Sequence, residues 1–478
     1  MVLKSIRSKM LAGVAGVVVL SLGAGLVAGA GAEPKQTGLK GAGGKAVAHL
    51  AGGKKVTAPN VPTARWYNTT LDAGEPTIAH SQDGSVFFVG ADIDTVGGRP
   101  NQVDVVRSDD HGGTWTNVSP KLGPENAHPV TLDPYIWMDK DTGRIFTIDL
   151  TVACSLLSFS DDEGASWITN PLACGRPVND HQTLFGGPAA TSSPVAYENL
   201  LYYCWNDVAT SSCSKSLNGG VTFQPTGSPA FQGVIVDDEG NRRVCGGLHG
   251  HGIVSPKDGT VFLPREYCGK PYVAISHDEG VTWEQVQVSR LDAPDGADPS
   301  MDVDAKGNVY YTWIGPDYNL WLTISRNNGK TWGKPMMVAA PGVNEANLPA
   351  IDVGDPGKIA ISYMGSENSP GNPREDGADY SRVTWNGYIT MSADVLAKRP
   401  VFYSGALNSR RDPIARGRCG PGRCGRVFDF IDVEISPDGT PWGSFVDACI
   451  EICAMPTGAS NYGDKGWAGR LVGGPKLR

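Results

Sequence analysis

The stretch Ser108-Asp109-Asp110-His111-Gly112-Gly113-Thr114-Trp115 contains a short pattern that returns along the chain. In this pattern a Ser precedes an acidic or amide residue, a Gly, a hydroxyl residue and an aromatic residue. Clear copies begin at Ser160, Ser276 and Ser325, and a more divergent copy begins at Ser216. The copies recur about every fifty residues, a period typical of stacked supersecondary units such as propeller blades.

Each copy is expected to form a turn between two strands. The short side chain of Asp110 can accept hydrogen bonds from the backbone amides ahead of it, and Gly112 tolerates a positive φ. Trp115 would then begin the outgoing strand as a large apolar anchor. The pattern therefore predicts a strand, a tight turn and a second strand at every copy.

The pattern Ser-x-Asp-x-Gly-x-Thr-Trp resembles the Asp box of the bacterial neuraminidase repeat proteins, which are sialidase-like β-propellers. This resemblance implies an all-β propeller in which the boxes lie on the blade rims, away from the substrate pocket. It therefore assigns a structural role to the box residues Asp110, Asp162, Asp278 and Asn327.

A second repeated unit consists of an apolar strand, a polar turn and a strand rich in aromatic and β-branched residues. Seven such units have their turns at Gly84, Gly143, Asn199, Gly259, Gly307, Gly357 and Gly439. In the first five, a box hairpin follows and completes four antiparallel strands, as a propeller blade requires. The last unit lacks a fourth strand, which we expect residues 66–71 to supply. Such ring closure would remove exposed sheet edges. We predict seven blades; six, as in typical sialidases, is the alternative if the last hairpin belongs to an insertion.

The chain divides into three parts by composition. Residues 1–32 combine Lys4, Arg7 and Lys9 with a following apolar run, which predicts a secretory signal peptide, with an uncleaved membrane anchor as the alternative. Residues 33–62 are rich in Gly, Ala and Lys and are predicted to be a flexible tail. Residues 63–478 would form a single propeller domain.

The ten Cys residues of an exported chain predict disulfides rather than metal binding or redox catalysis. Their spacing favours local pairs that staple neighbouring strands or loops. The expected pairs are Cys154 with Cys174, Cys204 with Cys213, Cys245 with Cys268, Cys419 with Cys424, and Cys449 with Cys453.

The net charge of -9 argues against nucleic acid or an anionic membrane as the main partner. We expect a secreted, extracellular monomer that makes no stable membrane insertion after signal cleavage. Its expected partner is an extracellular glycan or glycoconjugate.

Candidate site residues precede the innermost strand of each blade, because these strands begin near the central channel. Glu75 and Asp298 stand nine positions before their turn Gly, Asp133 and His249 stand ten before theirs, and His181 precedes the strand of the third unit. Neighbouring carboxylates could act as acid and base on a glycoside or hold a divalent cation such as calcium. The alternative is that Glu-Pro and Asp-Pro simply begin strands as capped turns. We expect no other cofactor.

The residues that the sialidase resemblance implies are only partly present. That family uses three arginines, a Tyr nucleophile paired with Glu, and an Asp acid/base. The stretch matching the first Arg element, Ala73-Gly74-Glu75-Pro76, contains no Arg, and Phe430 occupies the Tyr position. Asp298 resembles the Glu that activates the Tyr, and Asp104 resembles the acid/base only loosely.

A further cluster lies at the two ends of one predicted hairpin. His249 and His251 precede it, and Arg265 and Glu266 follow it, so these residues are candidates for substrate binding. Because strand side chains alternate between faces, not all of them can meet at one point. The alternative is a salt-bridged, disulfide-stapled blade.

The sequence thus predicts a secreted sialidase-like propeller that engages extracellular glycans without the standard Arg triad and Tyr nucleophile. One alternative is an active glycoside hydrolase that uses Glu75, Asp133 or Asp298. A second alternative is a noncatalytic binding or scaffold propeller.

Overall fold

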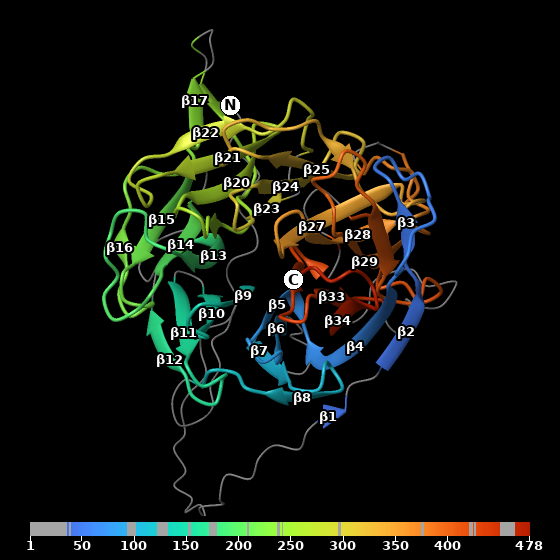
Figure 1. Cartoon of the computed structure of the whole chain (residues 1–478), viewed down its shortest axis with the longest axis horizontal. Helices are drawn as coiled ribbons and strands as arrows, with labels where there is room; N and C mark the ends of the chain where they lie inside the picture. Colours follow the sequence, from blue (N-terminus) through green and yellow to red (C-terminus); the bar gives the residue numbers. More distant parts are fainter. Residues whose placement is uncertain are drawn as a thin grey trace, which may run out of the picture. The chain divides into compact units, whose positions relative to one another are not determined.

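The computed structural model shows an all-β ring of seven blades, each built on four antiparallel strands (Figure 1). The prediction of seven blades is therefore confirmed. The residues described by the structure are 36–37, 40–92, 102–121, 132–151, 154–171, 179–207, 210–236, 240, 242–294, 298–373, 377–419, 424, 427–449 and 464–478. The predicted signal peptide, residues 1–32, lies outside these ranges.

Blades 1 to 4 follow the chain in order. Blade 1 holds β5 (Gly74–His80), β6 (Val86–Asp92), β7 (Gln102–Ser108) and β8 (Thr114–Asn117), with β1 (Gln36–Thr37) added outside β8. Blade 2 holds β9 (Leu132–Met138), β10 (Ile145–Thr151), β11 (Cys154–Ser160) and β12 (Ile168–Pro171), and blade 3 holds β13 (Asp180–Gly187), β14 (Leu200–Asp207), β15 (Thr210–Ser216) and β16 (Gln224–Pro225). Blade 4 holds β19 (Ile253–Val254), β20 (Val261–Tyr267), β21 (Lys270–Ser276) and β22 (Glu284–Gln287).

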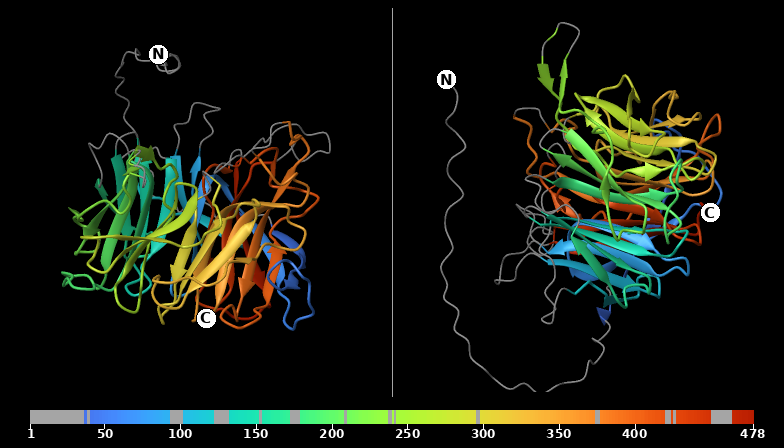
Figure 2. Two further views of the ribbon diagram at one scale, coloured as in Figure 1. Left: turned by 90° about the horizontal axis from the view of Figure 1, so that it is seen from above. Right: turned by 90° about the vertical axis from the view of Figure 1, so that its left-hand side faces the viewer.

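Blades 5 to 7 complete the ring. Blade 5 holds β23 (Ser300–Val303), β24 (Val309–Ile314), β25 (Leu320–Ser325) and β26 (Met336–Met337). Blade 6 holds β27 (Glu345–Val353), β28 (Ile359–Ser366), β29 (Thr384–Ser392), β30 (Phe402–Ala406) and β3 (Val47–His49), with β31 (Ala415–Arg416) paired to β29. Blade 7 holds β32 (Asp432–Ile435), β33 (Pro441–Asp447), β34 (Lys465–Val472), β4 (Thr63–Asp72) and β2 (Lys40–Lys45). A separate hairpin of β17 (Val234–Val236) and β18 (Arg242–Val244) extends beyond the blades (Figure 2, right).

The five repeat turns share one hydrogen-bond pattern. In the first, the Gly112 N–H donates to Ser108 Oγ at 2.8 Å, and Asp110 accepts from the backbone and hydroxyl of Thr114 at 2.7 and 3.0 Å. Gly112 has a φ of 86°, a conformation that side chains other than Gly rarely adopt. The Ser and Asp or Asn contacts recur in the turns that begin at Ser160, Ser216, Ser276 and Ser325.

The ring closes where the predicted N-terminal strand meets the end of the chain. In β4, Trp66 pairs with Gly469 and Tyr67 pairs with Ala468 of β34. The prediction that residues 66–71 supply the fourth strand of the last blade is therefore confirmed, and Figure 1 shows β4 beside β34.

The prediction of a flexible tail over residues 33–62 is wrong for the three segments that form the strands β1, β2 and β3. β2 pairs with β4 in blade 7, and β3 pairs with β30 in blade 6. A Cβ at Gly41 would lie 1.8 Å from Trp66 Nε1, so this Gly-rich strand lies directly against the indole. The lack of large apolar residues in β2 thus reflects close packing rather than disorder.

Polar side chains of the inner strands join neighbouring blades around the channel. Asp302 Oδ2 accepts from the Val353 N–H at 2.7 Å, and Asp352 Oδ2 accepts from the Ile435 N–H at 2.5 Å. The same kind of bond joins blade 7 to blade 1 and blade 1 to blade 2, through Ile78 N to Asp432 Oδ2 at 3.2 Å and Ile136 N to Thr77 Oγ1 at 2.8 Å. These bonds hold the channel wall together, while apolar clusters fill the spaces between the blades.

Three of the five predicted disulfides are confirmed: Cys204 with Cys213, Cys245 with Cys268, and Cys419 with Cys424. The other two predicted pairs include Cys174 and Cys453, which lie outside the described residues. Within the described ranges, no helix is long and apolar enough to cross a membrane.

Candidate functional site

Four inner strands begin with the same backbone irregularity. Glu75, Asp133, His181 and Leu348 have φ between 48° and 52°, in the left-handed region, and the strand register shifts at each of them. Residues other than Gly rarely adopt this conformation, and such strain is concentrated at functional sites. Three of the four are candidate site residues from the sequence.

A chain of hydrogen bonds links these strand starts across three blades. The Asp133 N–H donates to Glu75 Oε2 at 2.9 Å, and the His181 N–H donates to Asp133 Oδ2 at 3.0 Å. Glu75 Oε1 also accepts from the Asp429 N–H at 3.3 Å. The carboxylates of Glu75 and Asp133 are therefore bonded to the backbone of neighbouring blades.

His181 forms an ion pair with Asp298. Its Nε2 lies 2.9 Å from Asp298 Oδ2, although the N–H is not aligned as in a regular hydrogen bond. Burial opposes a charge on this imidazole, but the nearby Asp298 carboxylate outweighs it and raises the pKa of His181 to about 10. His181 is therefore an imidazolium at neutral pH.

Two further histidines surround this imidazolium and stay neutral. Burial lowers the pKa of His249 well below its ordinary value, and burial together with the charge of His181 lowers the pKa of His251 to about 3. The ring centres of His249 and His251 lie 5.9 and 6.1 Å from that of His181. Phe430 packs edge-on against His181 at 5.3 Å, and Tyr135 lies 4.3 Å from His251.

The acidic residues of this cluster lie in different electrostatic environments. Burial, strengthened by Asp133 and Asp429, raises the pKa of Glu75 well above its ordinary value. Burial also raises the pKa of Asp133, although the charge of His181 opposes this shift. The cluster thus combines Glu75, whose pKa is raised, with the ion pair of His181 and Asp298, so its acidic groups lie in chemically distinct environments.

The structure brings together six of the eight candidate residues that the sequence selects for catalysis and binding: Glu75, Asp133, His181, His249, His251 and Asp298. Sequence reasoning missed Tyr135 and Asp429, which contact the same cluster. Tyr135 stands two residues after Asp133 in β9, so strand alternation alone could have placed both side chains on one face.

Arg265 and Glu266 have mainly structural contacts instead. The Arg265 guanidinium donates to Ser211 Oγ at 3.0 Å and to the Gly247 carbonyl at 2.8 Å, between the rings of Phe231 and Tyr267. Glu266 accepts from the Gly269 N–H in the turn of its own hairpin. These contacts are structural, and the role of both residues in substrate binding stays a prediction.

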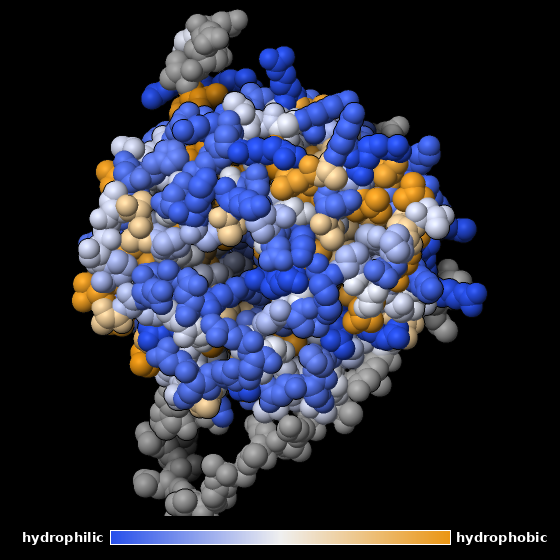
Figure 3. Space-filling view, viewed as in Figure 1, coloured by the Kyte–Doolittle hydropathy of each residue, from blue (hydrophilic) through white to orange (hydrophobic). Residues whose placement is uncertain are grey.

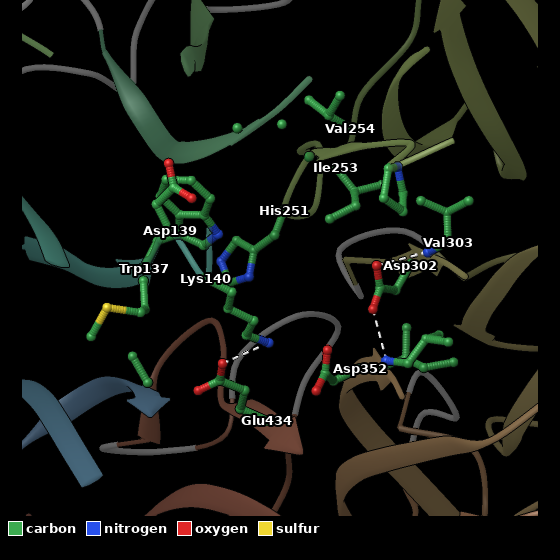
Figure 4. A pocket seen from close by; sticks show the side chains of 18 of the residues that line it. Trp137, Asp139, Lys140, His251, Ile253, Val254, Asp302, Val303, Asp352 and Glu434 are labelled. Atoms are coloured by element: carbon green, nitrogen blue, oxygen red, sulfur yellow. Dashed lines mark hydrogen bonds and ion pairs between the residues drawn. The ribbon is translucent and has the colours of Figure 1, made fainter. Parts of the chain in front are cut away.

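The channel continues beyond His251 into a polar cavity of about 360 Å³ (Figure 4). Lys140 extends into it and pairs with Glu434 at 2.8 Å, and Glu434 also contacts His80 at 2.9 Å. Hydrophilic side chains surround the middle of the face seen in Figure 3, where Figure 1 places the C-terminus. Sequence reasoning missed these residues because they lie in the later part of an inner strand, as His80 and Glu434 do, or in the turn after it, as Lys140 does, rather than before the strand.

A metal ion finds little support in this geometry. Within the described ranges, no three His, Cys, Asp or Glu side chains are arranged so that they could hold one. The predicted calcium site stays a prediction.

No protein-family model and no curated protein matches the chain. Solved structures with a similar fold include the Hadza microbial sialidase Hz136, at 14% identity and a TM-score of 0.42, covering 71% of this chain and 66% of that one. Penicillium chrysogenum α-L-arabinanase complexed with arabinobiose is 14% identical, with a TM-score of 0.40. The match covers 78% of this chain and 99% of that one. An Aleuria aurantia lectin mutant bound to α-methyl-L-fucoside is 10% identical, with a TM-score of 0.44. The match covers 72% of this chain and 97% of that one. This chain spans slightly less than two thirds of the sialidase. These likenesses concern the fold, and membership of the Asp-box family stays a prediction.

Proposed function

We propose that the protein is a secreted, glycan-binding propeller whose ligand contacts Asp298 at the channel end where the inner strands begin. One observation carries the proposal: the Asp298 side chain is 13% exposed and is held beside the His181 imidazolium. Glu75 and Asp133 are only 4% and 6% exposed. Of the three acids selected from the sequence, Asp298 is therefore the one that a ligand hydroxyl can best reach.

The charge of this site favours neutral or cationic sugar groups over sialic acid. The carboxylates of Asp298, Asp133 and Asp429 all act on the His181 imidazolium, so a sialic acid carboxylate would meet like charge. Phe430, at the position that the sialidase resemblance gives to the Tyr nucleophile, presents a ring to His181 and has no hydroxyl. We therefore expect little or no sialoside hydrolysis.

The positions of the carboxyl groups also favour binding over a hydrolysis mechanism that uses two carboxylates. Most glycosidases place two carboxyl groups on either side of the scissile bond, where both reach the substrate. Glu75 and Asp133 are buried and accept hydrogen bonds from the backbone of other blades. Hydrolysis remains the second candidate, because burial raises the pKa of Glu75 while Asp298 pairs with His181, so the cluster contains two acids in different environments.

Secretion is supported by the disulfides of blades 3 and 4 and of the segment before blade 7, since such bonds persist in oxidising compartments. The basic and apolar pattern of residues 1–32 points the same way.

The test combines binding to an array of neutral, amino and sialylated glycans with turnover of a panel of aryl glycosides. Asp298→Asn should abolish or strongly weaken binding. Asp161→Asn is the matched control, because this exposed carboxylate pairs with Arg144 on the rim of blade 2. Unchanged glycan binding by Asp298→Asn, or efficient sialic acid release by the wild type, would contradict the proposal. Turnover of a neutral glycoside that is lost in Glu75→Gln would favour the hydrolase.

A further inference from the structure

A groove of about 690 Å³ lies on the outer rim between blades 4 and 5, away from the channel. Its walls are the end of β22 with the residues after it, 286–291, and the segment before β26, 330–335, together with Trp321. We propose that this groove is a second binding site, for an acidic polysaccharide whose sugars carry carboxylate groups.

Two tryptophans give the groove its apolar surface. Trp321 donates its indole N–H to Asp317 Oδ1 at 2.7 Å, and Trp332 packs edge-on against Tyr311 with ring centres 5.9 Å apart. Both indoles are partly exposed, so the contacts that fix them leave part of each ring facing the groove. Large flat rings of fixed orientation suit the apolar faces of sugar rings.

Three cations stand around these rings. Arg290 lies on the blade 4 wall, and Lys330 and Lys334 lie on the blade 5 wall. All three are exposed, and none pairs with a carboxylate in the part of the chain that the structure describes. The carboxylate of Asp317 accepts the indole N–H of Trp321 beside the groove. Unpaired cations gathered on a chain of net charge -9 indicate an anionic ligand.

The combination selects among anionic ligands. Aromatic rings with cations on two separate walls suit a polymer chain in which apolar faces alternate with spaced negative charges. A uronic-acid polysaccharide has both features in every repeat. A nucleic acid carries a much denser charge, which the net negative charge of the protein would repel.

The experiment uses calorimetry with the full chain and hyaluronate oligosaccharides, which carry carboxylates but no sulfate. We expect binding that weakens as salt rises, because exposed charges are screened. Lys330→Glu combined with Lys334→Glu should lower the affinity by at least about tenfold. Lys306→Glu, an exposed site in the β23–β24 turn of the same blade, should leave it within about twofold of the wild type.

Further variants separate this site from packing effects and from the channel. Trp332→Leu should weaken hyaluronate binding more than Trp283→Leu, which changes the corresponding Trp of the blade 4 repeat turn. Asp298→Asn should leave hyaluronate binding unchanged, so failure of this proposal is distinct from failure of the channel proposal. The inference is overturned if neutral dextran binds equally well, if the double Lys variant binds like the wild type, or if only dextran sulfate, DNA or anionic vesicles bind.

Discussion

The imidazole of His181 pairs through Nε2 with Asp298 at 2.9 Å, while its backbone N–H donates to Asp133 at 3.0 Å. His181, at the start of β13 in blade 3, thus connects Asp133 of blade 2 with Asp298, which precedes β23 of blade 5. The contacts that would position a ligand also hold blades together. Ligand binding and fold stability are therefore coupled at this cluster.

The ion pair predicts a loss of stability at alkaline pH. The pKa of His181 rises from 6.5 to about 10 on folding, so its contribution is fully present below about pH 6.5 and is lost as pH rises through 10. Asp298→Asn should lower the free energy of unfolding by about 3 to 5 kcal/mol near neutral pH, because an imidazolium loses its partner. In urea unfolding experiments, the free energy of unfolding of this variant should also decrease less at alkaline pH than that of the wild type. A variant that follows the wild type at every pH would contradict this assignment.

Asp149 in β10 predicts a second pH effect. Its carboxylate is 1% exposed and has no hydrogen-bond partner in the described structure, and burial raises its pKa from 3.8 to about 8. Stability from this group is present at low pH and is lost as pH rises from about 3.8 to 8. As pH rises from about 3.8 to 8, the free energy of unfolding of Asp149→Asn should therefore increase relative to the wild type, by up to about 1.4 kcal/mol per pH unit. The exposed control Asp161→Asn should show no such trend in the same unfolding series.

The repeat turns predict graded effects on stability. Trp115 is buried and packs near Phe88, so Trp115→Ala should cost about 3 to 5 kcal/mol. Asp110→Ala removes turn hydrogen bonds on the exposed rim and should cost about 1 to 2 kcal/mol. Chemical denaturation measures both. If Asp110→Ala abolished glycan binding without changing stability, the structural assignment of this turn would fail.

The cysteines predict a fully oxidised chain. Thiol titration of the exported protein after unfolding should detect no free thiol, because the described pairs already join Cys204 to Cys213 and Cys245 to Cys268. Peptide mapping should also recover Cys154 with Cys174 and Cys449 with Cys453. Links between distant blades would refute the local pairing scheme.

The sequence was sufficient for the features that repeat. The turn glycines Gly84 and Gly307 both have positive φ, and counting back from them located Glu75 and Asp298 at the channel. The repeat spacing shows where each inner strand starts. The residues at these starts are the ones that converge at the channel.

The features that do not repeat could not be predicted. The strand β2 has almost no apolar side chains, and its fit depends on Trp66 lying against Gly41, a contact between segments with no common pattern. Arg265 stood beside the histidines in the predicted hairpin, yet its guanidinium bonds to Ser211 of blade 3. Side-chain direction depends on the neighbouring blade, which periodicity does not specify.

The pairing of β4 with β34 determines when this protein can finish folding. Asp72 at the end of β4 forms an ion pair with Lys465, 393 positions later in the chain. β4 therefore has no partner in β34 until the chain has been translated as far as Val472. A premature stop codon before Lys465 would leave β4 and β33 with open edges, and open strand edges are templates for aggregation.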